Sequence, residues 1–298
     1  MYASSTVGSI AEIFDEQPHC WLPYALGARY SDGCVYKAEG RLRFWIGVTD
    51  KEYADNVALA FKIGGIHVNT TNSTTKHGKI RRYVVSIKEH ANNNSVNNEV
   101  IKILKASWEN NRHIIEHCET CIAMFCKGFG DGDGGFTTNL TDVEYSNKDF
   151  RLLLYLQKLL GKLGIVSLGP NVKKYDPLTF CIRIARSSIE TFSKSVGFTI
   201  SRKQRILEEL SQKYKNSQEL SARVVIAANL VRLGLVRTQT EAARLLSVTQ
   251  SAISNYLRNK TKRSKLLHIP EIERLSKEYI NYPNSDVIIK EIQRLLIY

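Results

Sequence analysis

The sequence lacks any apolar run long enough to cross a membrane. In its basic C-terminal part the longest uncharged, largely apolar run is VVIAANLV, far short of the roughly 20 residues that a membrane span needs. The first residues, MYASSTVGSIAEIF, hold neither the basic start nor the apolar centre of a secretory signal. We therefore expect an intracellular, cytoplasmic protein without a membrane partner, with an organelle as the open alternative.

Disulfide cross-linking and covalent catalysis are also not indicated. The six cysteines lie inside apolar stretches and do not have the spacing of a short, cross-linked secreted domain. No Ser/His/Asp or Cys/His set with the arrangement of a nucleophilic catalyst stands out. We expect the cysteines to be reduced thiols.

One segment, HIIEHCETC, carries residue types that bind metal ions. It places His113, His117 and Cys121 at helical spacing, and Cys118 forms a C-x-x-C pair with Cys121. A zinc site usually needs a second pair of ligands, and none follows nearby in the sequence. Because the segment precedes an apolar helix, we predict that these side chains pack there without a metal ion.

Acidic residues are scarce relative to basic ones. The chain holds 29 Asp and Glu against 42 Lys and Arg, which gives a formal net charge of +13. Between residues 201 and 265 there are 14 basic and 4 acidic residues, so most of the excess lies in a fifth of the chain. This balance favours a polyanionic partner, either a nucleic acid or an acidic membrane.

What the sequence does contain is an internal repeat. The segments PYALGARYSDGCVY and MFCKGFGDGDGGFT each indicate an apolar helix with two small residues four positions apart, followed directly by Asp-Gly. Alternating strands and further helices follow each segment, so the order αββαββα occurs twice between about residues 10 and 214. The small residues are Gly27 and Ser31, then Gly128 and Gly132; the acids are Asp32 and Asp133, 101 positions apart.

This repeat predicts an α+β fold with pseudo-twofold symmetry, in which Asn147 takes the place of Asp50. Small residues at positions i and i+4 let two helices approach backbone to backbone. If the repeats pack through these helices, Asp32 and Asp133 lie side by side. Two close carboxylates raise each other's pKa unless a divalent cation binds between them. Oxygen ligands favour Mg²⁺ or Mn²⁺ over zinc.

The glycines of CKGFGDGDGG admit two other interpretations, which we reject. Gly130, Gly132 and Gly135 satisfy G-x-G-x-x-G, but a dinucleotide site needs a preceding strand, and the nearby aspartates would repel a pyrophosphate. A calcium loop needs an oxygen ligand at its fifth position and a glycine at its sixth, and Gly135 and Phe136 break that pattern. The segment is better explained as the end of a packed helix.

With these features the sequence resembles the LAGLIDADG homing endonucleases in their single-chain form. ALGARYSDG (25–33) and CKGFGDGDG (126–134) fill the nine-residue motif twice, and the similarity extends over about the first 210 residues. The resemblance implies two antiparallel sheets that form a saddle along the DNA major groove, with the motif helices as the interface between the repeats. It also implies that a monomer cuts both strands of a long, specific duplex across the minor groove, leaving short 3′ overhangs.

The resemblance further implies a metal site. Asp32 and Asp133 would hold Mg²⁺, for which Mn²⁺ would substitute, helped by the backbone carbonyls of Ser31 and Gly132. Arg29 departs from the motif, because an apolar residue is typical there, and Gly130 is its counterpart in the second motif.

Other catalytic and DNA-binding residues follow from the same resemblance. Asp50 and Asn147 would order water in the active site, although glutamine is more usual at Asp50. Lys51 and Lys203 would be the basic residues near the scissile phosphate, the latter within FTISRKQ. The sheet residues expected to face DNA are Arg41, Arg43, Arg81, Arg82, Lys173, Lys174 and Arg183.

The basic C-terminal part contains a second pattern. TQTEAARLLSVTQSAISNYLRNK (238–260) has the spacing of a helix-turn-helix, with Ala243 where the helices cross and Thr249 as the N-cap of the second helix. It resembles the repressor type, except that Ser247 replaces the usual turn glycine. Val248, Ile253 and Leu257 are the expected buried anchors. The expected DNA contacts are Gln250, Ser251, Ser254, Asn255, Arg258, Lys260, Lys262 and Arg263.

We therefore expect a two-repeat nuclease domain over residues 10–214, with repeats at about 20–115 and 118–214. A linker, QKYKNSQE, would join it to a helix-turn-helix domain over residues 220–265 and a helical tail over 266–298 of unassigned role.

Two other functions stay open. One is a transcription regulator without nuclease activity. A known regulator type joins a degenerate LAGLIDADG domain to a C-terminal helix-turn-helix, but it lacks the motif acids that Asp32 and Asp133 supply here. The other is a maturase that binds its intron RNA, whereas the repressor-like pattern favours duplex DNA.

Overall fold

The computed structural model describes residues 10–74, 81–89, 96–173, 176–258, 269–283 and 285–297. Contacts divide the chain into two compact units, with the boundary between Ser211 and Gln212. Among the helices of these described residues, none is both long and apolar enough to cross a membrane.

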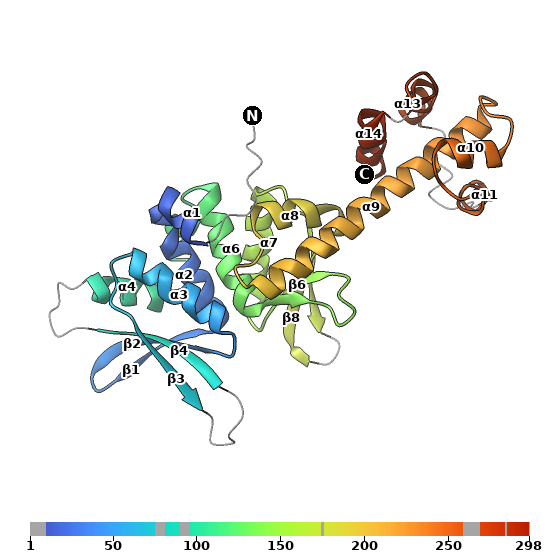
Figure 1. The fold of residues 1–298 in the computed structure, drawn as a ribbon. Coiled ribbons are helices and arrows are strands. Elements are labelled where there is room, and N and C mark those ends of the chain that lie inside the picture. The colour runs from blue at the N-terminus through green and yellow to red at the C-terminus, as the bar shows by residue number, and fades with distance from the viewer. Residues whose placement is uncertain are drawn as a thin grey trace. The chain divides into compact units, whose positions relative to one another are not determined.

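The first unit contains the same succession of elements twice (Figure 1). The first half also carries α1 (Ile10–Glu16), η1 (Pro18–Cys20) and α5 (Arg112–Ile115). Its repeated elements are α2 (Trp21–Ser31), β1 (Gly33–Ala38), β2 (Arg41–Val48), α3 (Lys51–Ile63), β3 (Asn69–Thr74), β4 (Arg81–Lys88) and α4 (Val96–Lys105). Those of the second half are α6 (Glu119–Asp133), β5 (Gly134–Phe136), β6 (Val143–Asn147), α7 (Phe150–Lys162), β7 (Ser167–Lys173), β8 (Asp176–Ile184), η2 (Arg186–Ser188) and α8 (Ile189–Ser195).

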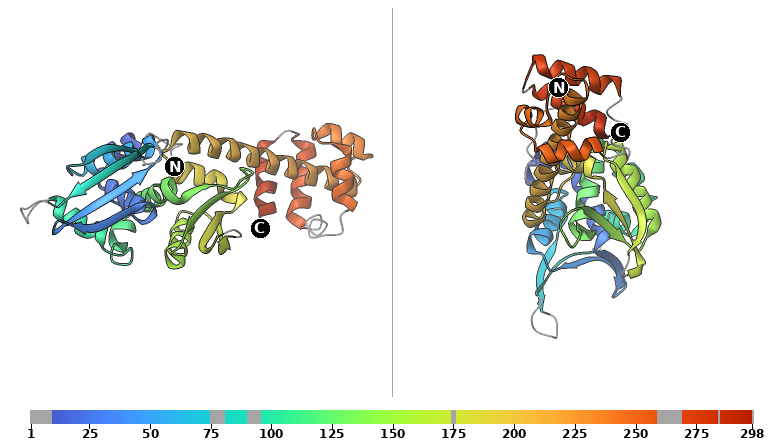
Figure 2. Two further views of the ribbon diagram at one scale, coloured as in Figure 1. Left: turned by 90° about the horizontal axis from the view of Figure 1, so that it is seen from below. Right: turned by 90° about the vertical axis from the view of Figure 1, so that its right-hand side faces the viewer.

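The strands form two four-stranded antiparallel sheets with the same strand order, β1-β2-β4-β3 and β5-β6-β8-β7. Helices cover one face of each sheet, α3 and α4 in the first half and α7 in the second (Figures 1 and 2). Period-two alternation places Phe44 and Ile46 of β2 in the core, whereas Arg43 and Trp45 lie on the opposite face. The predicted α+β fold with two αββαββα repeats is therefore confirmed.

Helices α2 and α6 pack against each other backbone to backbone. A Cβ atom on Gly27 would lie 2.2 Å from the carbonyl oxygen of Phe125, and one on Gly128 would lie 2.2 Å from that of Tyr24. Cβ atoms essentially never approach other atoms that closely, so only glycine fits at either position without movement of the helices. The prediction that small residues form the contact between the repeats is confirmed.

The helix caps correct one detail of the expected repeat alignment. Asp50 is the N-cap of α3, and its side chain accepts a hydrogen bond from the backbone N–H of Tyr53. The same position before α7 is Asp149, whose side chain accepts two such bonds. The strand registers give the same alignment of the two repeats, in which Asn147 at the end of β6 corresponds to Val48 at the end of β2. The expected pairing of Asn147 with Asp50 is wrong by two residues, because both helices need the aspartate as their cap.

The second unit is helical. Helix α9 (Ser201–Arg232) crosses the boundary, so the segment 212–219, expected as a linker, is helical instead. The segment was expected to be a linker because it is polar, but its Gln, Lys and Glu residues are good helix formers. The further helices are α10 (Gln239–Leu245), α11 (Gln250–Arg258), α13 (Pro270–Asn281) and α14 (Asp286–Ile297). The last two had no assigned role and share one hydrophobic core with α9, α10 and α11, to which Ile272, Leu275, Tyr279 and Ile292 belong.

Helices α10 and α11 have the spacing that the sequence predicts. Thr238 caps α10, and the hydroxyl of Thr249 accepts a hydrogen bond from the N–H of Ala252 at the start of α11. Ile253 is fully buried, and Val248 is partly buried against the same core. Ser247 has a φ of 52°, the left-handed conformation that makes glycine usual at this turn.

Candidate active site

Two carboxylates, one from each repeat, meet at the C-terminal ends of α2 and α6. Asp32 is the C-cap of α2, and Asp133 is the last residue of α6. An oxygen of Asp32 lies 2.6 Å from the point that a Cβ atom on Gly132 would occupy, and the hydroxyl of Ser31 lies 2.2 Å from it. The carboxylate of the first repeat therefore lies against the backbone beside the acid of the second, as the small residues predicted.

The site disfavours two negative charges. The pKa of Asp133 is raised to about 6, chiefly by burial; the charge of Asp32 contributes to the rise, and the hydrogen bond from Asn147 opposes it. Burial also raises the pKa of Asp32, against the positive charge of Lys203. Burial is thus the larger cause, whereas the sequence suggested mutual repulsion. A divalent cation between the two carboxylates would compensate both effects.

Asn147 positions the second carboxylate. Its Nδ2 donates to Oδ2 of Asp133 at 2.6 Å, and more weakly to the carbonyl oxygen of Tyr30 at 3.4 Å. Its Oδ1 accepts a bond from the N–H of Asp149, which holds the amide in place. In the first repeat the equivalent position is Val48, whose side chain has no polar atom. The two halves of the site therefore differ in how their acid is held.

Asp50 and Lys51, which were also expected at the site, make other contacts in the structure. Asp50 acts as the cap of α3, so its carboxylate is engaged with the backbone. Lys51 lies on the first turn of α3 and pairs with Asp55, with 65% of its side chain exposed. The structure therefore places Lys51 at the surface, where a phosphate can approach from solvent.

Lys203 holds the end of α6. Its ammonium donates to the carbonyl oxygens of Gly130, Asp131 and Gly134 at 3.1, 2.7 and 2.7 Å. These carbonyls lie at the C-terminal end of the helix, where a positive charge is stabilised. Burial lowers the pKa of Lys203, and the negative charges of Asp131, Asp32 and Asp50 oppose that shift. Lys203 thus brings a buried positive charge close to both acids.

Asp131 is a structural residue. Its buried carboxylate accepts hydrogen bonds from the hydroxyl of Tyr24 at 2.9 Å and from the N–H and hydroxyl of Thr199 at 2.9 and 2.6 Å. These bonds join α6, α2 and the segment before α9. Asp131 therefore secures the helix pair, while Asp133, two residues on, faces the site.

Sequence reasoning missed Tyr53. Its hydroxyl lies 3.2 Å from that of Ser31 and donates to the carbonyl oxygen of Gly128 at 3.3 Å. Burial, followed by the charge of Asp32, raises the pKa of Tyr53 well above its usual range. In the sequence it belongs to the apolar stripe of α3 with Val57 and Phe61, which is typical of a core residue. Only the packing of α3 against α2 shows the hydroxyl beneath the acids.

The hydrogen bonds of Arg29 lie within the first repeat. Its Nε donates to the carbonyl oxygen of Leu104 and its guanidinium to that of Gly33, so it joins α2 to the end of α4 and the start of β1. A Cβ on Gly130 would lie 2.6 Å from the hydroxyl of Tyr145, which fills that place in the second repeat. The departure from the motif therefore has a packing role.

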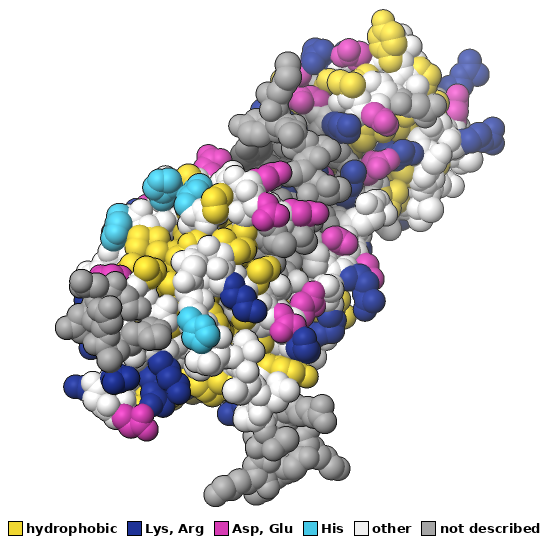
Figure 3. All heavy atoms as spheres, turned by 60° about the vertical axis from the view of Figure 1, so that its left-hand side comes forward, with side chains coloured by type: hydrophobic (Ala, Val, Ile, Leu, Met, Phe, Trp, Pro, Cys, Tyr) yellow, Lys and Arg dark blue, Asp and Glu magenta, His cyan; other side chains and the backbone are white. Residues whose placement is uncertain are grey.

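The open face of the first sheet is basic. Residues directly opposite each other in antiparallel strands share a face, and this rule places Arg41, Arg43, Arg82 and Lys88 together. Figure 3 shows Lys and Arg side chains close together at the lower end of the first unit. Lys88 was not predicted, although its alternation with Ser86 along β4 indicates the same face. The same face also carries Tyr36, Trp45, Asn69, Thr71, Ser73 and Ser86.

The second sheet is less basic on its open face. Glu144 pairs with Lys173 at 3.0 Å and with Arg183 at 3.3 Å, and only 14% of its side chain is exposed. Two of the predicted DNA-binding residues are therefore engaged with one acid. Lys174, Lys260, Lys262 and Arg263 lie outside the described residues, as does the side chain of Arg81. Of the predicted contacts on α11, Gln250, Ser251, Asn255 and Arg258 are exposed, and Ser254 is partly buried.

The raised pKa of Asp133 predicts a pH-dependent stability in the absence of divalent cations. An aspartate in the unfolded chain has a pKa of about 3.9, so between pH ~4 and ~6 the folded protein binds more protons and its stability falls as pH rises. Asp133→Asn removes this cost, and we expect it to raise the free energy of unfolding at pH 7.5 by about 1–2 kcal/mol, allowing for partial exposure. Urea unfolding at pH 7.5 and pH 4 measures this. A gain that does not shrink towards pH 4 would contradict it.

Parts of the chain are similar to known proteins. Residues 120–197 match the sequence profile of the LAGLIDADG-like domain. No curated protein matches the chain. Among solved structures, mesophilic variants of the homing endonuclease I-DmoI are 15% identical, and the match covers 64% of this chain and 98% of that one with a TM-score of 0.48. I-DmoI in complex with DNA and Mn is 15% identical, covering 60% and 96% with a TM-score of 0.46.

Full-length DUF199/WhiA from Thermatoga maritima is also similar, at 12% identity over 87% of this chain and 92% of that one, with a TM-score of 0.45. The match to the LAGLIDADG-like domain model spans residues 120–197, about a quarter of the chain. It includes Asp133, Asn147 and the whole second sheet.

Proposed function

We propose that this chain is a LAGLIDADG enzyme of the homing type, a site-specific endonuclease that uses Mg²⁺ to hydrolyse one phosphodiester in each strand of a long duplex target. One observation carries the proposal: Asp32 of one repeat lies against Gly132, beside Asp133 of the other, at the ends of two helices that only glycine allows to touch. A site shared by two repeats suits a substrate with two strands of opposite direction. Such an enzyme would act in the cytoplasm, or in an organelle that holds its target DNA.

The donor atoms at this site suit a hard cation. Asp32 and Asp133 offer carboxylate oxygens, and Ser31 and Gly132 offer backbone carbonyls beside them. These residues would hold Mg²⁺, and Mn²⁺ accepts the same ligands. When bound, the metal supplies activation of the attacking water and stabilisation of the leaving 3′ oxygen.

The remaining residues prepare the site. Asn147 keeps the carboxylate of Asp133 in one orientation, and Asp149 holds Asn147 in turn. Lys203 fixes the end of α6, and its positive charge near Asp32 and Asp133 would offset the negative charge that develops on a phosphate during attack. Lys51, exposed on α3, would contact the phosphate in the first half. Asp50 contributes by capping α3, and any role in ordering water would require it to leave that cap.

The open faces of the sheets would bind the DNA grooves. The first sheet forms a curved surface (Figure 2, right) with Arg41, Arg43, Arg82 and Lys88 among polar side chains that can contact base edges. The second sheet would bind the other half of the target as a weaker electrostatic partner. By resemblance, cleavage across the minor groove would leave short 3′ overhangs, and one chain would suffice as a monomer.

The second unit would lengthen the recognised sequence. Helices α10 and α11 are joined by a short turn, and α11 presents Gln250, Ser251, Asn255 and Arg258 to solvent. Amide and hydroxyl groups of this kind bind base edges, and arginine binds phosphates.

An unbiased cleavage assay tests the proposal and finds the target sequence at the same time. Genomic fragments from the source organism, together with a randomised duplex library, are incubated with the full chain and Mg²⁺, and the new DNA ends are sequenced. We expect ends at one sequence, with 3′ overhangs, in Mg²⁺ or Mn²⁺ and none in chelator. Tight binding of one duplex without cutting in either metal would replace the proposal with a regulator. Preference for a structured RNA would replace it with a maturase.

Glu144 gives a prediction about DNA affinity. Because it pairs with Lys173 and Arg183, we expect Glu144→Gln to release both for phosphate contacts and to strengthen binding of duplex DNA about 3–10-fold near physiological salt. The salt dependence of binding should steepen by about one to two charges. Fluorescence anisotropy over a salt series measures both. Glu99→Gln, which removes the exposed partner of Lys102 on α4, is the control and should change neither; an unchanged Glu144→Gln would refute the prediction.

A further inference from the structure

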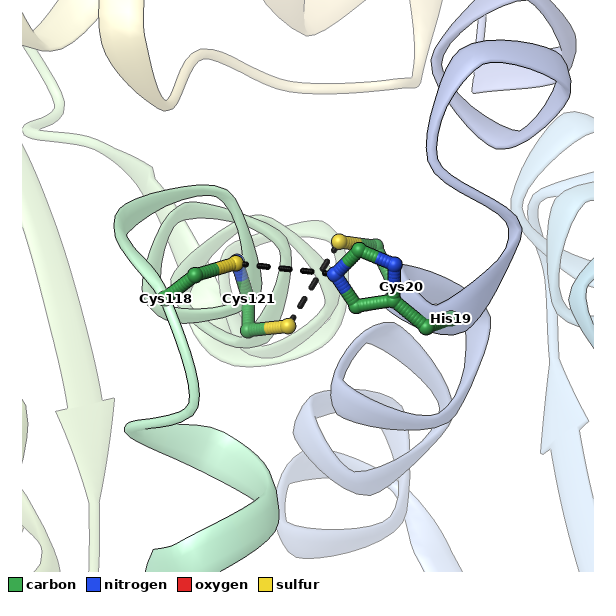
Figure 4. Close-up of side chains that lie close together, drawn as sticks. All are labelled: His19, Cys20, Cys118 and Cys121. Carbon is green, nitrogen blue, oxygen red and sulfur yellow. Dashed lines mark hydrogen bonds between the residues drawn. The ribbon is translucent and has the colours of Figure 1, made fainter.

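Four side chains with metal-binding atoms meet at the other end of the helix pair, away from Asp32 and Asp133 (Figure 4). His19 and Cys20 precede the first residue of α2, while Cys118 and Cys121 lie at the start of α6. The helices run parallel, so each repeat brings two ligands to one place. The expectation that Cys118 and Cys121 have no second pair of ligands is wrong, because that pair lies about a hundred residues upstream, in the other repeat.

The distances between these atoms fit one tetrahedral ion. Sγ of Cys20 lies 3.5 Å from Sγ of Cys121, Nε2 of His19 lies 3.6 Å from Sγ of Cys118, and all four ligand atoms lie within 4.8 Å of one another. Zinc bonds of about 2.3 Å to sulfur and about 2.0 Å to nitrogen at tetrahedral angles give S–S and S–N separations of about 3.8 and 3.6 Å. Small side-chain adjustments, which separate the closest sulfurs slightly and shorten the longer distances, would therefore complete the site.

The chemistry of the donors selects the metal. Three thiolates and one imidazole are soft ligands that bind Zn²⁺, whereas Mg²⁺ takes oxygen ligands. With four protein ligands no position is left for water or substrate, which is the arrangement of a structural zinc site. The two ends of the helix pair therefore suit different metals.

The local structure also prepares the site. Cys118 is the N-cap of α6, and its sulfur accepts a bond from the N–H of Cys121 at 3.3 Å. Helix N-termini favour negatively charged ligands, and Cys20 and Cys118 occupy the N-cap positions of α2 and α6. Cys20 and Cys121 are buried, whereas His19 is exposed, which leaves a side from which the ion can enter. The ring of His117 stacks edge-on against that of His19.

We propose that His19, Cys20, Cys118 and Cys121 bind one structural Zn²⁺ that joins the N-terminal ends of α2 and α6 and so ties the two repeats together. This site is separate from the proposed nuclease centre. It would fix the parallel alignment of the helices on which the meeting of Asp32 and Asp133 depends. His113, despite its helical spacing from Cys121, does not belong to the cluster.

The first experiment measures metal content. Full-length protein is reduced, loaded with Zn²⁺, desalted in excess Mg²⁺ and assayed by mass spectrometry of the metal; we expect about one Zn²⁺ per chain. His19→Ala, an exposed change that should leave the fold intact, and Cys118→Ser should lower this at least fivefold. Cys34→Ser, at an exposed cysteine of β1, is the matched control and should retain the ion. Reduced, folded wild type that holds no zinc would overturn the proposal.

Two further measurements use the wild-type protein, so they remain valid even if a variant fails to fold. Co²⁺ bound to wild type should show the absorption of tetrahedral thiolate coordination, and an octahedral spectrum would refute the site. Removing zinc should lower the unfolding temperature by about 5–10 °C. Zinc removal should lower the unfolding temperature of Asp133→Asn by the same amount, which would show that the effect does not arise from the metal site at Asp32 and Asp133. Mass spectrometry of the intact protein would detect a Cys20–Cys121 disulfide as a loss of two hydrogen atoms. If such protein still binds no zinc after reduction, the proposal is also overturned.

Discussion

Asp133→Asn is expected to lower the rate of target cleavage by about 10³-fold or more, while DNA affinity changes by less than about threefold. The amide cannot supply the negative charge that a divalent cation requires between Asp32 and Asp133. In the function proposed above, DNA binding would depend instead on the open sheet faces, where Arg41 and Lys88 lie, and these are not altered. The loss should therefore fall on the chemical step alone.

Asp32→Asn should show the same loss, since the two acids form one site from two repeats. Single-turnover cleavage of a labelled duplex, followed strand by strand at saturating protein, measures each rate, and anisotropy measures binding. If either variant cuts both strands at the wild-type rate, the assignment of the metal site is wrong.

Asp131 provides the matched control, because it lies two residues from Asp133 on the same helix. Its two carboxylate oxygens accept bonds from Tyr24 and Thr199, so Asp131→Asn puts an NH2 donor where one of these oxygens now accepts. We expect a loss of about 1–3 kcal/mol in the free energy of unfolding. Cleavage per folded molecule should fall far less than in Asp133→Asn. The opposite pattern would exchange the roles of the two aspartates.

The sequence predicted those features of the candidate site that occur in both repeats. Asp32 and Asp133 follow small residues at the same spacing in each repeat, and the same spacing predicts that the helices touch. Backbone contact leaves a direct trace in sequence, because only glycine tolerates it at Gly27 and Gly128. Fold class, helix pairing and paired acids therefore follow from local patterns.

The part that could not be predicted depends on contacts between distant segments with no repeat to reveal them. Lys203 occurs once, and nothing in FTISRKQ shows that its ammonium caps α6. His19 and Cys118 each stand where the other repeat has a residue of a different kind, Thr120 and Gln17, so comparing the repeats conceals their meeting. Asn147 was expected to order water; the structure shows its amide bonded to Asp133, and the strand register aligns it with Val48 and not with Asp50.

The contact between α2 and α6 gives the second large prediction, because the whole site depends on it. A methyl group on Gly128 would lie 2.2 Å from the carbonyl oxygen of Tyr24, a backbone atom that cannot move without α2. We expect Gly128→Ala to lower the free energy of unfolding by about 3–5 kcal/mol, beyond the usual 1–3 for overpacking, because neither backbone can yield separately. Gly27→Ala should behave similarly. Urea unfolding followed by circular dichroism measures both.

Gly161→Ala is the control that separates this contact from the general effect of adding a methyl group to a helix. Gly161 lies in α7, is exposed, and would have nothing within 4 Å of an added Cβ. Alanine should there stabilise the protein by about 0.5–1 kcal/mol through helix propensity. If Gly128→Ala lowers the free energy of unfolding and Gly161→Ala raises it, steric contact between the repeats is the cause of the loss. Comparable small effects at Gly128 and Gly161 would mean that the helices have room to separate, and then Asp32 and Asp133 would not be held together by this interface.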